Sequence, residues 1–325
     1  MKVCIVGVGA IGGFLGARLA EAGCEVSAVA RGATAAALRT HGLRVQSGSG
    51  ITSARVVVAE DPAALGEQDL VVVAVKGPAM VDVAARIAPL LHADTMVLTA
   101  MNGVPWWFFH GFGGRFVGTR LQSIDPDGAI AAAIPDRHVV GCVVHMSCAT
   151  VEPGLTRHVF GNQLIIGDPD GRISPRIEAL AAALERAGFA TTVSASIQSE
   201  VWYKLWGNMT MNPVSALTGA TADRIIADPL VNRFCLDVMA EAAAIGTAIG
   251  CPIAQSGEDR IAVAAKLGVF KTSMLQDVEA GKPVELDALV TVVREIGERA
   301  GIATPRIDAL LGLARVHAQV RGLYR

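Results

Sequence analysis

A glycine-rich turn near the start of the chain constrains its fold more than any other feature. The turn, Gly7-Val8-Gly9-Ala10-Ile11-Gly12, follows an apolar β-branched run, Lys2–Val6, and precedes a helical pattern over Gly13–Ala22. A second strand pattern, Glu25–Arg31, comes next. A G-x-G-x-x-G that leaves a strand and opens a helix inside a βαβ unit of about 30 residues is typical of dinucleotide-binding domains.

The three glycines of this turn have separate physical roles. Gly7 permits the tight turn, Gly9 lets the backbone approach a pyrophosphate, and Gly12 lets the helix pack closely on the strand. The first helical turn, which includes Ala10 and Ile11, then offers unpaired backbone N–H groups and a partial positive charge to the phosphates. A glycine-rich turn without a ligand is the alternative, and the βαβ context favours the dinucleotide.

The end of the second strand indicates which dinucleotide is bound. An NAD site places Asp or Glu there to accept a hydrogen bond from the ribose 2′-hydroxyl. This strand ends in Val29-Ala30-Arg31-Gly32. Arginine cannot accept a hydrogen bond, but it can pair with a 2′-phosphate and stack on adenine. Arg31 therefore predicts NADP, with a solvated surface arginine as the alternative.

Strand and helix patterns continue to alternate up to residue 195. The further strand segments are Arg55–Val58, Asp69–Val75, Thr95–Ala100, Val139–Cys148, Leu155–Phe160 and Ala190–Val193. The turn Glu152-Pro153-Gly154 predicts a hairpin between two of them. We therefore expect an α/β, Rossmann-type dinucleotide-binding domain over residues 1–195.

Beyond residue 195 the strand patterns stop, and six helical segments follow between Gln198 and Val320. A chain of 325 residues is long enough for two hydrophobic cores. The change from alternating elements to continuous helix predicts an all-α substrate domain over residues 196–325.

One helix of this second domain has a polar stripe on an otherwise apolar surface. Lys204, Asn208 and Asn212 recur at i, i+4 and i+8, so they share a face. A lysine suits carbonyl reduction, because an ammonium stabilises the negative charge that develops on a ketone oxygen and can donate the proton. The alternative is a stripe that only satisfies structural hydrogen bonds.

Composition excludes several classes of function. The formal net charge is −2 and no basic block occurs, so a nucleic-acid partner is not expected. No apolar stretch reaches the ~18 residues of a membrane span. The six cysteines include no C-x-x-C pair, and we expect a cytoplasmic protein without a metal site. A homodimer is compatible with the sequence, which does not define the oligomeric state.

The chain as a whole resembles the ketopantoate reductases, formally 2-dehydropantoate 2-reductases. The matching segments are VGVGAIGGFLGARLAEAG at the N-terminus, AVKG after the fourth strand, MNGV at 101–104, W-x-K-L-x-x-N-x-x-x-N-P around Lys204, and S-M-L-Q-D from Ser273 followed by V-E-L-D from Val284. Related dehydrogenases also carry K-x-x-x-N. The segments S-M-L-Q-D and V-E-L-D, at this spacing, are therefore more specific for the ketopantoate reductases.

The resemblance implies a Rossmann domain followed by a helical domain like the C-terminal one of 6-phosphogluconate dehydrogenase. It also implies NADPH-dependent reduction of a 2-oxo acid, ketopantoate first, to the 2-hydroxy acid in pantothenate biosynthesis. The implied roles are as follows: Lys204 as general acid, Glu285 and Asn208 holding Lys204 and the substrate hydroxyl, Asn212 in the same pocket, Ser273 on the substrate carboxylate, Asn102 near the nicotinamide ribose and the reacting carbonyl, and Lys76 beside the adenosine phosphate or ribose.

Two departures from the family pattern leave the substrate open. Phe270 stands where some members carry a substrate-binding asparagine, and Pro105-Trp106-Trp107-Phe108-Phe109 replaces the usual short polar turn after MNGV. One alternative is therefore a paralogue that reduces a more apolar 2-oxo acid. Another is a non-catalytic NADP-binding regulator, which the retained Lys204 and Glu285 disfavour.

Overall fold

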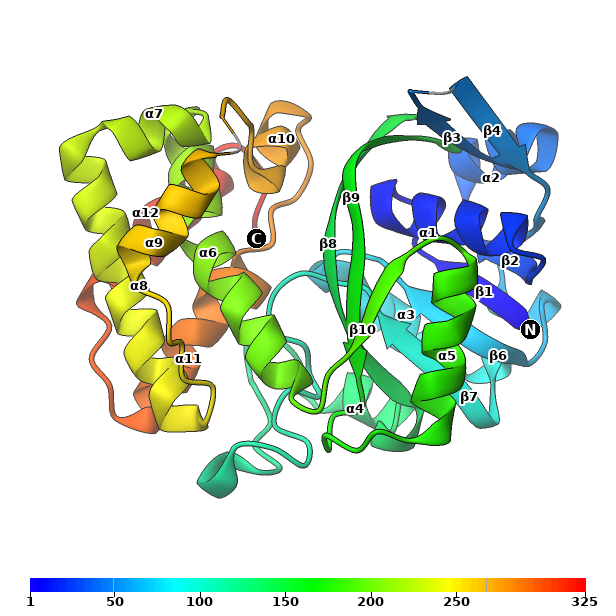
Figure 1. Ribbon diagram of the computed structural model, residues 1–325, viewed down its shortest axis with the longest axis horizontal. Helices are drawn as coiled ribbons and strands as arrows, with labels where there is room; N and C mark the ends of the chain where they lie inside the picture. Colours follow the sequence, from blue (N-terminus) through cyan, green and yellow to red (C-terminus); the bar gives the residue numbers. More distant parts are fainter. Residues whose placement is uncertain (49, 267) are drawn as a thin grey trace. The chain divides into compact units, whose positions relative to one another are not determined.

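The computed structural model describes every residue of the chain apart from 49 and 267 (Figure 1). The chain divides into two compact units, residues 1–101 with 127–200 and residues 102–126 with 201–325. The sequence predicts two uninterrupted domains with a boundary at 195. The division in the structure falls at 200 instead, and residues 102–126 group with the helical unit.

In the described part of the first unit, ten strands form one sheet in the order β4-β3-β9-β8-β7-β6-β1-β2-β5, with β10 beside β9. The strands are β1 (Lys2–Val6), β2 (Glu25–Val29), β3 (Leu43–Ser47), β4 (Gly50–Ala54), β5 (Val57–Ala59), β6 (Gln68–Val73), β7 (Leu91–Thr99), β8 (Val139–Glu152), β9 (Leu155–Gly167) and β10 (Ala190–Val193). Parallel β1 lies between β2 and β6, and pairs Val3 with Val26 and Leu70.

The helices of this unit are α1 (Ala10–Glu21), α2 (Gly32–His41), α3 (Met80–Arg86), α4 (Ala129–Ala133) and α5 (Pro175–Arg186). Phe14 and Leu15 of α1 and Leu184 of α5 share a buried core with Ile5 of β1 and Ile166 of β9. Apolar strands such as β1 and β6 are buried on both faces because helices cover the sheet. This confirms the expected α/β class.

The predicted hairpin is present, since β8 and β9 pair antiparallel on either side of Pro153-Gly154. Helix α2 and the β3–β4 hairpin were not predicted from the sequence. β4 is largely exposed and carries no alternating apolar pattern. β3 joins the sheet by pairing in parallel with β9, which lies more than a hundred residues further along the chain. Long-range pairing of this kind leaves little local signal.

The second unit is helical. Its helices are α6 (Ile197–Thr218), α7 (Ala222–Ala227), α8 (Pro229–Ile249), α9 (Gly257–Ala265), α10 (Ser273–Glu279), a π-helical turn (Asp287–Thr291), α11 (Val292–Ala300) and α12 (Pro305–Val320). Two buried tryptophans join α6 to α8: the Trp202 indole N–H donates to the carbonyl of Ala242, and that of Trp206 to Met239 at 2.7 Å. These bonds satisfy the polar atoms of two large apolar side chains.

Aromatic residues explain why 102–126 belongs to this unit. Trp107, Phe108 and Phe109 are almost fully buried, and the ring of Phe108 lies 6.0 Å from that of Trp202. The Arg115 guanidinium also donates to the Ala300 carbonyl at the end of α11. Burial of large aromatic surface outweighs proximity along the chain, so this segment packs in the helical core.

A half-buried carboxylate holds the same segment on α11. Glu295 accepts hydrogen bonds from the backbone N–H groups of Gln122 and Ser123 at 2.8 and 2.9 Å and from the Ser123 hydroxyl at 2.7 Å. Burial opposes ionisation of Glu295, but these bonds and one from Arg299 outweigh it and lower the pKa of the carboxyl. The ionised carboxylate therefore stabilises the folded unit.

Glu295→Gln is expected to lower the free energy of unfolding at pH 7 by about 1–3 kcal/mol. A carboxyl whose folded pKa is depressed contributes stability above its unfolded pKa of ~4.3, and that contribution is lost as the pH falls through the folded pKa. The difference from wild type should therefore shrink in acid, as measured by urea unfolding at several pH values. Glu298→Gln, on an exposed ion pair of the same helix, is the control, and equal effects of the two variants would contradict the assignment.

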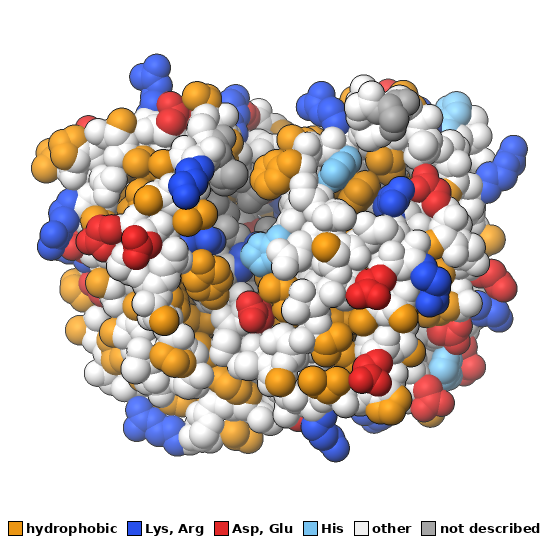
Figure 2. Space-filling model, in the orientation of Figure 1, with side chains coloured by type: hydrophobic (Ala, Val, Ile, Leu, Met, Phe, Trp, Pro, Cys, Tyr) orange, Lys and Arg blue, Asp and Glu red, His pale blue; other side chains and the backbone are white. Residues whose placement is uncertain are grey.

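On the face shown in Figure 2, acidic and basic side chains are interspersed. Within the described residues no helix is long and apolar enough to cross a bilayer, and no group of three or more His, Cys, Asp or Glu side chains is placed to hold a metal ion.

Candidate active site

The glycine turn between β1 and α1 has the geometry that dinucleotide binding requires. Gly7 has a φ of +97°, and a Cβ there would stand 2.7 Å from the Ala74 carbonyl oxygen. A Cβ on Gly12 would lie 2.1 Å from the oxygen of Gly7. Around Gly9, by contrast, no described atom beyond its neighbours along the chain lies within 4 Å of a Cβ position. Two glycines therefore allow close packing, and the third leaves the backbone accessible to a ligand.

The first turn of α1 is open to an anion. Gly9 is the N-cap and brings no capping side chain, and no acidic residue occurs in the first turn. The first helical hydrogen bond runs from the N–H of Gly13 to Gly9 at 2.8 Å. The N–H groups of Ala10, Ile11 and Gly12 precede it, at the positive end of the helix dipole. The residues present thus fit a pyrophosphate.

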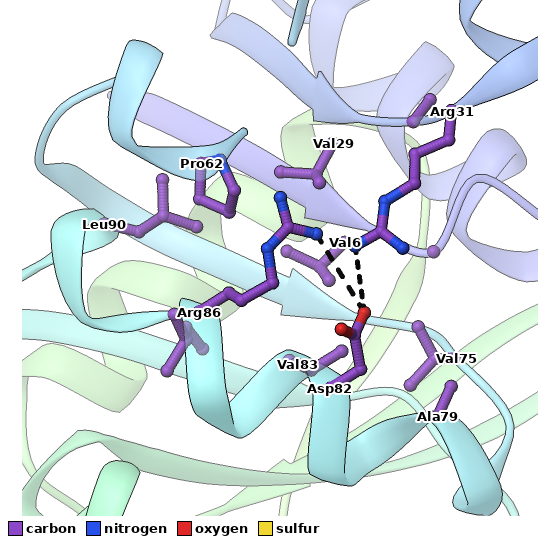
Figure 3. A pocket seen from close by; sticks show the side chains of 13 residues that line it. Val6, Val29, Arg31, Pro62, Val75, Ala79, Asp82, Val83, Arg86 and Leu90 are labelled. Atoms are coloured by element: carbon purple, nitrogen blue, oxygen red, sulfur yellow. Dashed lines mark hydrogen bonds and ion pairs between the residues drawn. The ribbon is translucent and has the colours of Figure 1, made fainter. Parts of the chain in front are cut away.

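A pocket of about 200 Å³ opens beside this turn (Figure 3). Gly7 and Arg31 both line it, so the structure brings together the two features from which the sequence analysis inferred NADP. Its other lining residues include the apolar side chains of Val29, Pro62 and Leu90. An apolar slot with an arginine at its edge suits an adenine ring that carries a charged ribose substituent.

Two charged residues of this pocket were not predicted from the sequence. Asp82 and Arg86 both lie on α3, and both line the pocket with Arg31. The Arg31 Nη2 atom donates to Asp82 Oδ2 at 3.0 Å. The i, i+4 spacing of an aspartate and an arginine was visible in the sequence, but nothing local placed this pair next to Arg31.

Lys76, the other predicted phosphate or ribose contact, follows β6 and is half-buried as the N-cap of the short 3₁₀ turn Gly77–Ala79. The chain runs from Lys76 through this turn into α3, which carries the pocket residues Asp82 and Arg86. Its role as a cofactor ligand stays a prediction.

The predicted general acid is oriented within the second unit. The Lys204 ammonium, half-buried on α6, donates to Asn102 Oδ1 at 2.9 Å. Asn102 is itself held by the turn that follows it, because the Val104 N–H donates to the Ala288 carbonyl at 2.9 Å in the π-helical turn. Gly103, with a φ of +85°, allows this contact, since a Cβ there would stand 2.3 Å from the Ala288 oxygen. The π-helical turn thus supports the segment that carries Asn102, the hydrogen-bond partner of Lys204.

A second pair joins two other predicted residues. The buried Asn212 side chain donates to the Ser273 hydroxyl at the start of α10, at 3.4 Å. Asn208 lies half-buried one turn beyond Lys204, and Glu285 is half-buried just before the π-helical turn. The structure thus brings together Lys204 with Asn102 and Asn212 with Ser273. The roles of Asn208 and Glu285 rest on the sequence resemblance.

Comparisons with known proteins cover the whole chain. Residues 3–107 match the family described as "Ketopantoate reductase PanE/ApbA", and residues 196–318 match its C-terminal family. A 2-dehydropantoate 2-reductase of Mesorhizobium japonicum is 45% identical over 100% of both chains. Another, from Halobacterium salinarum, is 32% identical over 97% of this chain and 98% of its own.

Solved structures agree with this assignment. A crystal structure from Ralstonia solanacearum, provisionally described as a ketopantoate reductase, has a TM-score of 0.96 and 60% identity over 99% of each chain. A 2-dehydropantoate 2-reductase from Methylococcus capsulatus has a TM-score of 0.84 and 27% identity over 99% of this chain and 98% of its own. Together with the two-unit fold and the residues described above, these matches show that the chain belongs to the ketopantoate reductase family of dinucleotide-dependent oxidoreductases.

Proposed function

We propose that the protein reduces a 2-oxo acid to the 2-hydroxy acid with NADPH, and that its substrate is 2-dehydropantoate. The observation that carries this proposal is the Lys204 ammonium on α6, held at 2.9 Å by Asn102. A positioned ammonium is a proton donor for a ketone oxygen. Membership of the family and the names of its 45% and 32% identical relatives support the choice of substrate.

The cofactor proposal depends on the first unit. The open backbone at Gly9 and the N–H groups of the first turn of α1 would hold the pyrophosphate, and Arg31 would pair with the 2′-phosphate. NADPH, when bound, supplies the hydride. We place the reaction in the cytoplasm, where NADPH is available.

The residues of the second unit would perform the remaining work. Lys204 would stabilise the charge that develops on the ketone oxygen and then protonate it, so that the carbonyl becomes a hydroxyl. The Asn102 Oδ1 atom accepts a hydrogen bond from that ammonium and thereby fixes its direction. Ser273, steadied by Asn212, would bind the substrate carboxylate. Glu285 and Asn208 would bind the primary hydroxyl of 2-dehydropantoate.

Oxidation of NADPH and NADH by the purified protein, with 2-dehydropantoate, 2-oxoisovalerate or no oxo acid, tests this proposal. We expect turnover with NADPH and 2-dehydropantoate. We also expect 2-oxoisovalerate to be reduced measurably, because half-buried Phe270 offers only apolar contact where an amide would discriminate. A site that hydrogen-bonds the hydroxyl can reject an analogue without it by ~10⁴.

The other outcomes of this assay assign different functions. A preference for 2-oxoisovalerate would identify a reductase of more apolar oxo acids. NADPH binding without reduction of either acid would identify a non-catalytic binding protein. Discrimination against 2-oxoisovalerate near ~10⁴ would mean that Phe270 does not face the substrate, and Phe270→Asn should then leave the ratio of the two kcat/KM values unchanged.

A further inference from the structure

One carboxylate at the edge of the α1 pocket lies between two guanidinium groups (Figure 3). Asp82 Oδ2 is 3.0 Å from Arg31 Nη2 and 3.9 Å from Arg86 Nη1. Arg31 extends from the end of β2, and the other two residues lie one turn apart on α3. Three charges from two elements therefore meet at one point of the pocket.

The two arginines differ in how firmly they are held. The Arg31 side chain is 56% exposed, and it donates a hydrogen bond to Asp82. The Arg86 side chain is 29% exposed, and its Nη2 atom donates to the Glu60 carbonyl at 2.7 Å. Asp61 lies 3.9 Å from the same guanidinium. Arg86 is therefore fixed against the pocket wall, whereas Arg31 depends on Asp82.

The charges suit an anion that carries more than one negative charge. A single carboxylate cannot saturate the donors of two guanidinium groups, each of which presents five N–H bonds. A phosphate monoester carries about −1.5 to −2 charges near pH 7 and offers three acceptor oxygens. It can form bidentate hydrogen bonds with arginine. Such a group would satisfy both arginines better than Asp82 does.

We propose that Arg86 completes the 2′-phosphate site with Arg31, and that Asp82 is an internal counter-ion that this phosphate displaces. The inference rests on the proposed use of NADPH and extends it to two residues of α3. Without a 2′-phosphate, as with NADH, Asp82 stays between the arginines and offsets part of their positive charge. The selectivity for NADPH over NADH is then set by three residues together.

Calorimetric titration of the full chain with adenosine 2′,5′-bisphosphate and with adenosine 5′-monophosphate tests this directly. Arg86→Ala should raise the Kd of the bisphosphate about 10- to 100-fold, the loss of a charge-assisted hydrogen bond, and change that of the monophosphate less than about twofold. Asp82→Asn should lower the Kd of the bisphosphate about two- to fivefold, because the pair with Arg31 is exposed and weak.

Arg31→Ala is the reference variant, and Arg39→Ala is the matched control. Arg39 lies on α2, forms an exposed ion pair with Glu60 and does not line the pocket, so its loss should leave both Kd values unchanged. If Arg86→Ala weakens both nucleotides equally, Arg86 only supports the pocket and the inference is wrong. If Asp82→Asn weakens the bisphosphate, Asp82 positions Arg31 rather than competing for it, which also overturns the inference.

The readout separates this inference from the proposed reaction. Neither nucleotide contains nicotinamide, so a protein that reduces no oxo acid can still show the expected shifts. If the wild-type chain binds the two nucleotides equally, the proposed NADPH preference fails and the inference fails with it. If wild type binds the bisphosphate more tightly than the monophosphate, but Arg86→Ala leaves the ratio of the two Kd values unchanged, only the inference fails.

Discussion

Lys204→Ala is expected to lower kcat for the reduction of 2-dehydropantoate by roughly 10²–10⁴, the usual contribution of a positioned proton donor. The ammonium stands half-buried on α6 and donates to Asn102, and alanine removes both the proton and the charge that would stabilise the oxyanion. Single-turnover and steady-state rates with saturating NADPH would measure the loss.

The binding of NADPH separates a chemical role from a structural one. Alanine is a good helix former, and the glycine turn and Arg31, which carry most of the proposed contacts to the cofactor, belong to the first unit, so the variant should bind NADPH with a Kd close to that of wild type. Lys266→Ala removes an exposed lysine after α9 and should retain full activity. Unchanged kcat in Lys204→Ala would mean that the polar stripe of α6 is only structural.

Gly12→Ala is expected to abolish measurable NADPH binding and to lower the melting temperature by roughly 5–10 °C. The added Cβ would stand 2.1 Å from the Gly7 oxygen and 3.1 Å from the Ala74 Cβ. A backbone oxygen cannot move aside like the end of a flexible side chain, so α1 must shift away from β1 and β6. The shift displaces the N–H groups of its first turn.

Gly9→Ala is the matched comparison because its Cβ meets no described atom within 4 Å. This variant should melt within a degree or two of wild type but bind NADPH more weakly, since its methyl group would occupy the space through which the pyrophosphate approaches the backbone. Differential scanning fluorimetry and NADPH titration of both variants give the two readouts. Normal NADPH binding by Gly9→Ala would refute the proposed phosphate site.

Elements that depend on local pattern could be predicted from the sequence. The strand–turn–helix around Gly7–Gly12 and the apolar helix around Lys204 are both specified within about 20 residues, because period and turn chemistry act over that distance. Candidate residues on one helix face were also predictable, since Lys204, Asn208 and Asn212 follow the helical repeat. The domain class followed from the order of these elements.

The partners of those residues were decided by tertiary structure. Asn102 meets Lys204 from 102 residues away, and Asp82 meets Arg31 across 51 residues. Glu295 binds the backbone of Gln122 and Ser123 from α11, and so helps to bring residues 102–126 into the helical unit. The sequence by itself determined the dinucleotide fold, the place of Arg31 at the end of the second strand pattern and the helix face that carries Lys204. Which groups orient or neutralise these side chains depended on long-range packing, because a contact between distant segments exists only once the cores that bring them together have formed.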